Sequence, residues 1–147
     1  MSLLLSPMAK NSSAGFYNGV ATTSLRLDSV AKKALNRTMT TGNRRLFTYS
    51  FWFKITKLGS KFLLSKGENV SNADVSKIQI NSSDQLVVQE AIDDSGTLNL
   101  VTTRKFRDTS AWYNVVIAFD TAQGTSANRI KVYVNGVQET SFGTASY

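Results

Sequence analysis

The sequence predicts an all-β domain built as an antiparallel sandwich or barrel, and three observations lead to this class. About eight or nine short segments alternate apolar and polar residues, or are dense in β-branched and aromatic residues. Polar turn sequences separate these segments at intervals of roughly 8–12 residues. The connections are too short for helical crossovers, so neighbouring strands are expected to run antiparallel. A chain of 147 residues fits a single domain.

The first part of the chain shows little periodicity. Residues 1–23 are rich in Ser, Asn, Gly and Ala, which predicts an N-terminal extension before a domain that covers residues 24–147. Residues 24–27 alternate as a short strand, and residues 30–35 form either one helical turn or an irregular loop.

The clearest strand is expected at residues 47–54. Period-two alternation places four aromatic side chains on one face, namely Phe47, Tyr49, Phe51 and Phe53. The opposite face carries Trp52 among polar residues. Further strands are expected at residues 61–65, 77–80, 85–89 and 98–103, with polar turns at residues 81–84 and 93–96.

Two strong signals lie in the C-terminal third. Residues 112–119 are apolar on both faces, which favours a strand in the middle of a sheet. Trp112 and Trp52 are expected to pack in or against the core as structural residues, although exposed aromatic side chains also stack on sugar rings. Residues 129–134 and 137–142 flank Asn135 and Gly136, a dipeptide that predicts a structural type I′ turn because both positions need positive φ.

Composition excludes several kinds of chemistry. The chain has no Cys and no His, so disulfides, the usual zinc, copper or haem sites, and Ser-His-Asp or Cys-His nucleophiles are excluded. No apolar run approaches the length of a membrane-spanning helix, and the first residues lack the basic region of a signal peptide. We expect no cofactor and no membrane partner.

Charge is unevenly distributed along the chain. Residues 1–67 hold eleven Lys and Arg and one acid, a net charge of +10, whereas residues 68–147 hold six and nine, a net charge of −3. The basic half either meets an acidic partner or consists of solvated strand and loop ends that keep the protein soluble. No nucleic-acid motif accompanies it, so nucleic acid is not expected as a partner.

The carboxylates form no recognisable site. Glu90 and Asp93 are three positions apart and would point to opposite faces of a strand, so a glycosidase pair is not expected. The spacing of Asp93, Asp94, Asp108 and Asp120 does not resemble a calcium loop. Asp108 is instead expected to cap the turn that leads into the strand at residues 112–119. We therefore expect no catalytic residue and no metal.

The strand before the Asn-Gly turn carries the candidate ligand-binding residues. Arg129, Lys131 and Tyr133 share one face by period two. This strip suits an acidic glycan or an acidic protein, and it equally fits an ordinary solvated strand face.

Two segments resemble a known family. Residues 106–121, around Trp112, and residues 128–137, with the Tyr-Val-Asn-Gly sequence, resemble the concanavalin A-like lectin/glucanase superfamily. More narrowly, they are similar to the laminin-G-like jelly-roll domains of phage virion proteins. Residues 24–27, 42–44 and 49–54 resemble the same group in the same order, so the resemblance covers about residues 22–143.

This resemblance implies a jelly-roll β-sandwich and a non-enzymatic virion structural protein of a bacteriophage, in a tail fibre, a tail or a capsid decoration. Its partners would be other virion proteins and copies of itself, and its location would be the virion, after synthesis in the host cytoplasm. The alternative is an adhesion module that binds a carbohydrate on the host surface. Such domains usually continue past the Asn-Gly turn, so we expect either a sandwich that lacks its last strands or neighbouring subunits that cover an open edge.

Overall fold

The structure, a computed structural model, describes residues 35–38, 40–67, 75–92 and 95–147. The chain divides into two compact units, residues 1–40 and residues 41–147, and every described strand belongs to the second. The extension predicted at residues 1–23, the strand predicted at 24–27 and most of the segment 30–35 lie outside the described residues. The same holds for the first two residues of the turn predicted at 93–96, and its last two residues begin β5.

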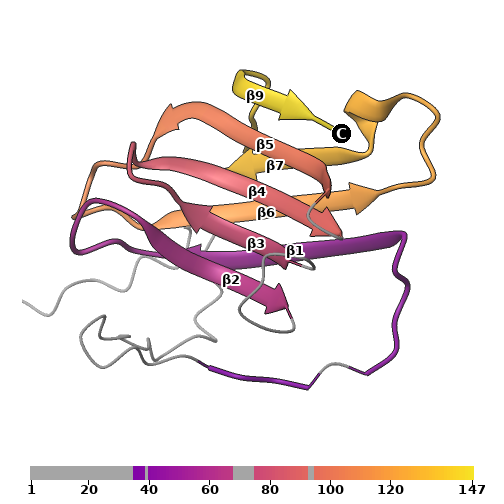
Figure 1. Cartoon of the computed structure of the whole chain (residues 1–147). Coiled ribbons are helices and arrows are strands. Elements are labelled where there is room, and N and C mark those ends of the chain that lie inside the picture. The colour runs from indigo at the N-terminus through magenta and orange to yellow at the C-terminus, as the bar shows by residue number, and fades with distance from the viewer. Residues whose placement is uncertain (1–34, 39, 68–74, 93–94) are drawn as a thin grey trace, which may run out of the picture. The chain divides into compact units, whose positions relative to one another are not determined.

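Short strands make up most of the described part of the second unit (Figure 1). In chain order the elements are β1 (Leu46–Phe53), β2 (Lys61–Gly67), β3 (Val75–Ile80), β4 (Gln85–Ile92), β5 (Ser95–Lys105), β6 (Tyr113–Asp120), the 3₁₀ helix η1 (Ser126–Asn128), β7 (Ile130–Val134), β8 (Val137–Gln138) and β9 (Phe142–Ser146). Among the described residues, no helix is long and apolar enough to cross a membrane.

The strands form two antiparallel sheets. One sheet has the order β1-β6-β7-β8, and the other has the order β2-β3-β4-β5-β9. Figure 1 shows β2, β3, β4 and β5 side by side in the second sheet. Buried apolar side chains of both sheets join in a single cluster, so the sheets pack face to face. The prediction of an all-β antiparallel sandwich is confirmed.

The core lies between the two sheets. Its members alternate along each strand with residues that point outward, which is the pattern of a sheet with one buried face. The largest completely or almost completely buried apolar side chains are Phe106, Ile80, Leu86, Leu100, Ile117, Val115, Val132 and Val134.

The predicted alternation of β1 is also present. Phe53 belongs to the core cluster, while Phe47, Tyr49 and Phe51 pack against it. The ring of Phe47 stacks on that of Phe119, with the ring centroids 4.5 Å apart. β6 lies between β1 and β7, as expected for a strand that is apolar on both faces.

Asn135 and Gly136 connect β7 to β8 in the conformation that their sequence predicts. Their φ angles are 51° and 80°, and Val134 pairs directly with Val137 across the turn. The side-chain oxygen of Asn135 accepts the backbone N–H of Asn114 at 2.8 Å, and the backbone N–H of Asn135 donates to the Asn114 carbonyl at 2.9 Å. The turn is therefore fastened to β6 as well as to its own hairpin.

Valine at position 136 is expected to destabilise the domain by more than about 1 kcal/mol, because a β-branched residue is strained at positive φ. A Cβ atom at Gly136 would meet no atom within 4 Å, so the loss would come from backbone conformation alone. Urea unfolding of the Gly136→Val variant measures this loss of stability. Gly42→Val is the matched control, since Gly42 also has open space around it but no positive φ. Equal urea midpoints for the two variants would contradict the expectation.

The prediction of one strand at residues 137–142 is wrong. β8 ends at Gln138, and β9 begins at Phe142 in the other sheet, beside β5. Polar contacts to β5 hold the crossing segment. The carboxylate of Glu139 pairs with Arg104, and the backbone N–H of Thr103 donates to the Ser141 carbonyl at 3.2 Å. Because of these contacts the segment after Gln138 follows β5 of the other sheet and does not extend the hairpin of β7 and β8.

The expectation that Trp52 and Trp112 belong to the core is also wrong, because each is 48% exposed. Trp52 lies opposite Asn114 on the face of β1 that points away from the core. The neighbour of Trp112, Tyr113, takes the inward position, with its ring centroid 5.4 Å from that of Phe53. The alternation of inward and outward side chains along β1 and β6 was predicted correctly. The outward face of this sheet is more exposed to solvent than the apolar residues on both faces of the segment 112–119 led us to expect.

Candidate functional site

The candidate site lies on the face of the four-stranded sheet that points away from the core. The odd-numbered residues 115–119 of β6 are buried in the core, so the even-numbered residues between them point outward. Ala118 lies opposite Lys131 of β7, and Val116 lies opposite Tyr133. Because directly opposite residues share a face, these four side chains form one surface.

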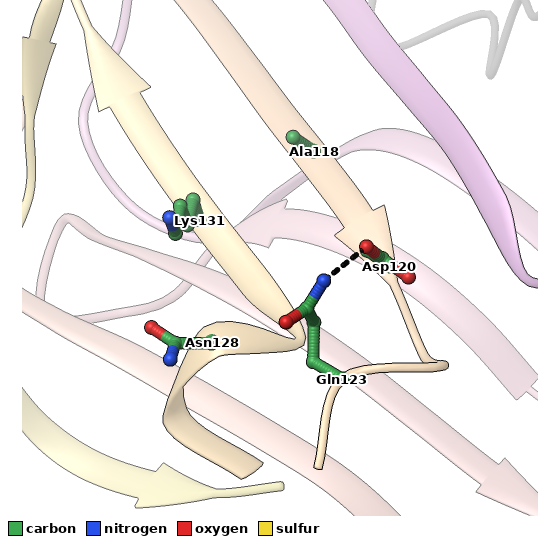
Figure 2. Close-up of a pocket in the computed structure, with 5 residues that line it drawn as sticks. All are labelled: Ala118, Asp120, Gln123, Asn128 and Lys131. Atoms are coloured by element: carbon green, nitrogen blue, oxygen red, sulfur yellow. Dashed lines mark hydrogen bonds between the residues drawn. The ribbon is translucent and has the colours of Figure 1, made fainter. Parts of the chain in front are cut away.

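A pocket of about 230 Å³ lies at one end of this surface (Figure 2). Its lining residues are Ala118, Asp120, Gln123, Asn128 and Lys131. β6 supplies the first two, β7 supplies Lys131, and the loop that joins these strands supplies the others. Two paired strands and their own connecting loop therefore build the pocket.

Hydrogen bonds within the loop of residues 121–129 fix its shape. The backbone N–H of Asn128 donates to the Thr125 carbonyl at 3.0 Å. The guanidinium Nε of Arg129 donates to the Gln123 carbonyl at 2.9 Å. The wall that carries Gln123 and Asn128 is therefore pre-organised, and a ligand need not order it.

The carboxylate of Asp120 is hydrogen-bonded to residues of the same loop. Its Oδ1 accepts the backbone N–H of Ala122 at 3.2 Å, and its Oδ2 accepts the side-chain amide of Gln123 at 2.5 Å (Figure 2). Its backbone N–H donates to the Arg129 carbonyl at 2.7 Å, which closes the base of the loop. The carboxylate of Asp120 therefore positions the amide of Gln123.

Two of the three predicted binding residues share the outward face. Lys131 lines the pocket, and Tyr133 lies two residues further along β7; both are half-buried. The strand prediction is wrong at Arg129, because β7 begins only at Ile130 and Arg129 has the helical φ and ψ of −70° and −28° at the end of η1. Period-two alternation stops where the strand stops, so the Arg129 side chain turns to the loop.

Gln123 and Asn128 were not singled out from the sequence, and Asp120 was considered only as a calcium ligand. The available signal was the polar segment 123–128 between two strands that pair directly. The side chains of such a loop lie at the end of the sheet face that its strands share.

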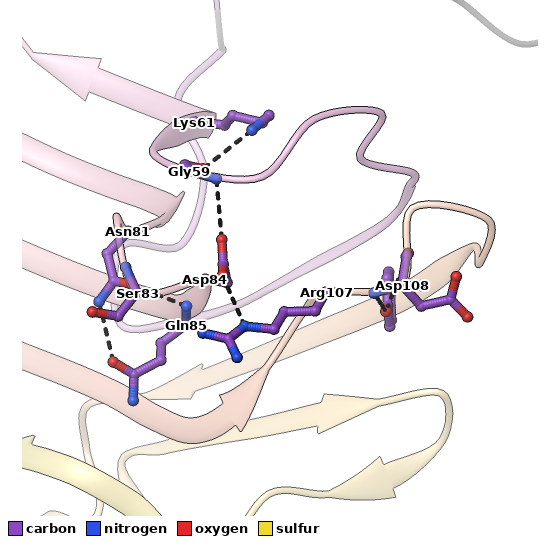
Figure 3. A network of polar contacts seen from close by, with 9 residues as sticks. Gly59, Lys61, Asn81, Ser83, Asp84, Gln85, Arg107 and Asp108 are labelled. Atoms are coloured by element: carbon purple, nitrogen blue, oxygen red, sulfur yellow. Dashed lines mark hydrogen bonds and ion pairs between the residues drawn. The ribbon is translucent and has the colours of Figure 1, made fainter.

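Asp84 is the centre of a polar network at the turn between β3 and β4 (Figure 3). The backbone N–H of Gly59 donates to its Oδ1 at 3.0 Å, and Nε of Arg107 donates to its Oδ2 at 3.0 Å. These two contacts hold the pKa of Asp84 below its ordinary value, against the opposing effect of burial. The Asp84 carbonyl also accepts the backbone N–H of Phe106 at 2.7 Å, so this carboxylate has a structural role.

Asp108 caps the turn before β6, as the sequence indicated. Its Oδ1 accepts the Ser110 hydroxyl at 2.6 Å and the backbone N–H groups of Ser110 and Ala111 at 2.8 and 3.2 Å. These bonds, the Ser110 hydroxyl first, lower the pKa of Asp108. Neither Asp84 nor Asp108 lines the pocket.

The chemistry of the pocket suits binding. It offers two amide side chains, one ammonium group and one carboxylate that is already hydrogen-bonded to the loop. Over the ranges that the structure describes, no group of three or more acidic side chains is placed to hold a metal ion. Asp93 and Asp94 lie outside those ranges.

Two antiparallel sheets of four and five strands packed face to face form the β-sandwich architecture of concanavalin A-like domains. The laminin-G-type model of the concanavalin A-like lectin/glucanases superfamily matches residues 17–147, and the chain belongs to this family. Domains of this type are typically non-catalytic and fit roles in carbohydrate binding or adhesion. Comparisons with curated proteins and with solved structures gave no match.

Proposed function

We propose that this chain is a non-enzymatic carbohydrate-binding module that recognises a surface glycan through the outward face of its four-stranded sheet. The observation that carries the proposal is the pre-organised pocket beside Tyr133. A few convergent polar groups next to an aromatic ring are the usual composition of a sugar site, because hydroxyls need hydrogen bonds and the ring face needs an apolar contact.

The same face is long enough for more than one sugar ring. Ala118 at the pocket and Asn114 are four positions apart on β6, which corresponds to roughly 13 Å along the strand. Tyr133 lies between these two ends, because it pairs with Val116. Trp52 lies opposite Asn114 and is half-exposed, so a second aromatic surface lies at the far end. This arrangement supports an extended oligosaccharide as the ligand.

Replacing Tyr133 with alanine is expected to weaken glycan binding about fivefold, the effect of losing one aromatic contact of roughly 1 kcal/mol. A glycan array would identify ligands of the wild-type domain, and calorimetry would then compare the variants. Phe62→Ala is the control, since Phe62 is an exposed aromatic residue of the other sheet and should leave binding unchanged. A domain that binds no glycan on the array, or equal binding by both variants, would contradict the proposed site.

An assembly role in a phage virion is a second candidate, and one observation favours it. Large apolar side chains are exposed on β1 and β2 and in the segment between them, namely Leu46, Leu58, Phe62 and Leu64. β1 and β2 are terminal strands in the two described sheets, and exposed apolar surface at such positions favours packing against other protein chains. Its partners would be other virion proteins or copies of this chain, and mass spectrometry of purified virions would test it. Absence of the chain from the particles would refute this candidate.

A further inference from the structure

We propose that the pocket between β6, β7 and their loop binds the carboxylate of an acidic sugar, with Lys131 as the group that recognises the charge. This inference rests on the proposed glycan-binding function and names the class of sugar that the pocket selects. It follows from the charges, the hydrogen-bond partners and the size of the pocket.

The ammonium group of Lys131 has no acidic partner bonded to it in the described part of the protein. Lys131 is half-buried in the pocket lining, and among the described residues its ammonium group has neither a hydrogen bond nor an ion pair. Asp120 is the acidic residue of the lining, and its two carboxylate oxygens accept hydrogen bonds from Ala122 and Gln123. Arg129 adds a second positive charge to the same loop through its bond to the Gln123 carbonyl. Within the lining, the charge of Lys131 is balanced by that of Asp120, and Arg129 outside the lining gives the loop and the pocket together one positive charge in excess. This excess favours an anion.

The second step concerns the polar groups beside that charge. Asn128 has no side-chain hydrogen bond to any described residue and lines the pocket together with Lys131. Its amide and the ammonium group of Lys131 provide donors for the two oxygens of a carboxylate. Figure 2 shows the amide nitrogen of Gln123 directed at Asp120, which leaves the amide oxygen to accept a sugar hydroxyl. The lining thus matches a ring that carries both an acid and hydroxyls.

The third step concerns size and the number of charges. A volume of about 230 Å³ is below the roughly 300–1,000 Å³ typical of pockets for drug-sized ligands, so the pocket suits one sugar ring or less. Lys131 is the basic residue of the lining, whereas polysulfated or polyphosphorylated chains are held by clusters of Lys and Arg. A single carboxylate is the anion that this lining fits.

The test compares acidic oligosaccharides with the same molecules after methyl esterification, which removes the charge and keeps the ring. Suitable probes are oligogalacturonate, hyaluronan oligosaccharides and sialyllactose, beside neutral oligosaccharides and dextran sulfate. Wild-type protein is expected to bind at least one free acid about tenfold or more tightly than its ester. That preference should shrink as salt is added, because the ammonium group is partly exposed to solvent.

Lys131→Met and Lys131→Gln should abolish the preference for the acid, whereas Lys131→Arg should retain it. The matched control is Lys77→Met, which removes the same charge from a half-buried lysine on the outward face of the other sheet. Equal binding of acids and esters, tighter binding of dextran sulfate, or an unchanged preference in Lys131→Met would overturn the inference. In those cases glycan binding itself would stand. Failure to bind any oligosaccharide would remove both this inference and the proposed function.

Discussion

Replacing Phe106 with alanine is expected to lower the free energy of unfolding by about 3–5 kcal/mol, the usual cost of deleting a fully buried aromatic ring. Phe106 is 0% exposed and belongs to the core cluster. Its ring centroid lies 5.8 Å from that of Phe53 and 5.0 Å from that of Tyr113, so the loss would leave a cavity between several rings. Its backbone N–H also donates to the Asp84 carbonyl, which limits how far the chain can move to fill that cavity.

Urea unfolding followed by tryptophan fluorescence measures this loss. Phe62→Ala is the matched control, because it deletes the same ring from a position that is 65% exposed, and its effect should stay within about 0.5 kcal/mol. Similar losses for the two variants would show that Phe106 does not lie in the core that the structure assigns to it.

The features that the sequence predicted correctly depend on neighbours in the chain. Alternation places Phe47 and Phe53 on the same side of β1 because the side-chain period of a strand is two. The positive φ of Asn135 and Gly136 follows from the residues themselves. The cap by Asp108 needs only Ser110 and Ala111, which lie two and three positions away.

The features that could not be predicted depend on pairing across the sheets. The pocket exists because Ala118 lies opposite Lys131, and that register cannot be read from either strand alone. The burial of Trp52 depends on what covers the outward face of β1, a property of the whole domain. The network of Asp84 joins Gly59 and Arg107, which lie 25 and 23 positions away from it.

The candidate site was predicted in part for the same reason. Lys131 and Tyr133 were placed correctly on one outward face because both lie within β7, where alternation holds. Arg129 lies one residue before that strand, and the hydrogen bond to the Gln123 carbonyl, six positions away, decides where its side chain points. Side chains at strand ends are thus the ones for which sequence periodicity is least informative.

The second large effect is expected on acidification, and it concerns Asp84. The pKa of its carboxyl is lowered from the ordinary value of 3.8, chiefly by the backbone N–H of Gly59 and then by Arg107. The folded protein therefore holds the ionised form more strongly than the unfolded chain does. This stabilisation is fully present above the unfolded pKa and is lost as the pH falls through the lower folded pKa. The urea midpoint of the wild type should thus show no change from this group between about pH 7 and pH 5, and should fall below about pH 4.

Asp84→Asn isolates the charge, because asparagine keeps an oxygen that can accept the Gly59 N–H and tolerates the φ of 63° at this position. The variant should unfold at a temperature several degrees lower than the wild type at neutral pH, since Arg107 loses its partner. It should also lose less stability than the wild type on acidification. Asp108→Asn is the comparison, because Asp108 also has a lowered pKa but lies on an exposed turn, so both effects should be smaller. Stability curves for Asp84→Asn and the wild type that stay parallel down to about pH 3 would show that the Asp84 charge contributes nothing to folding.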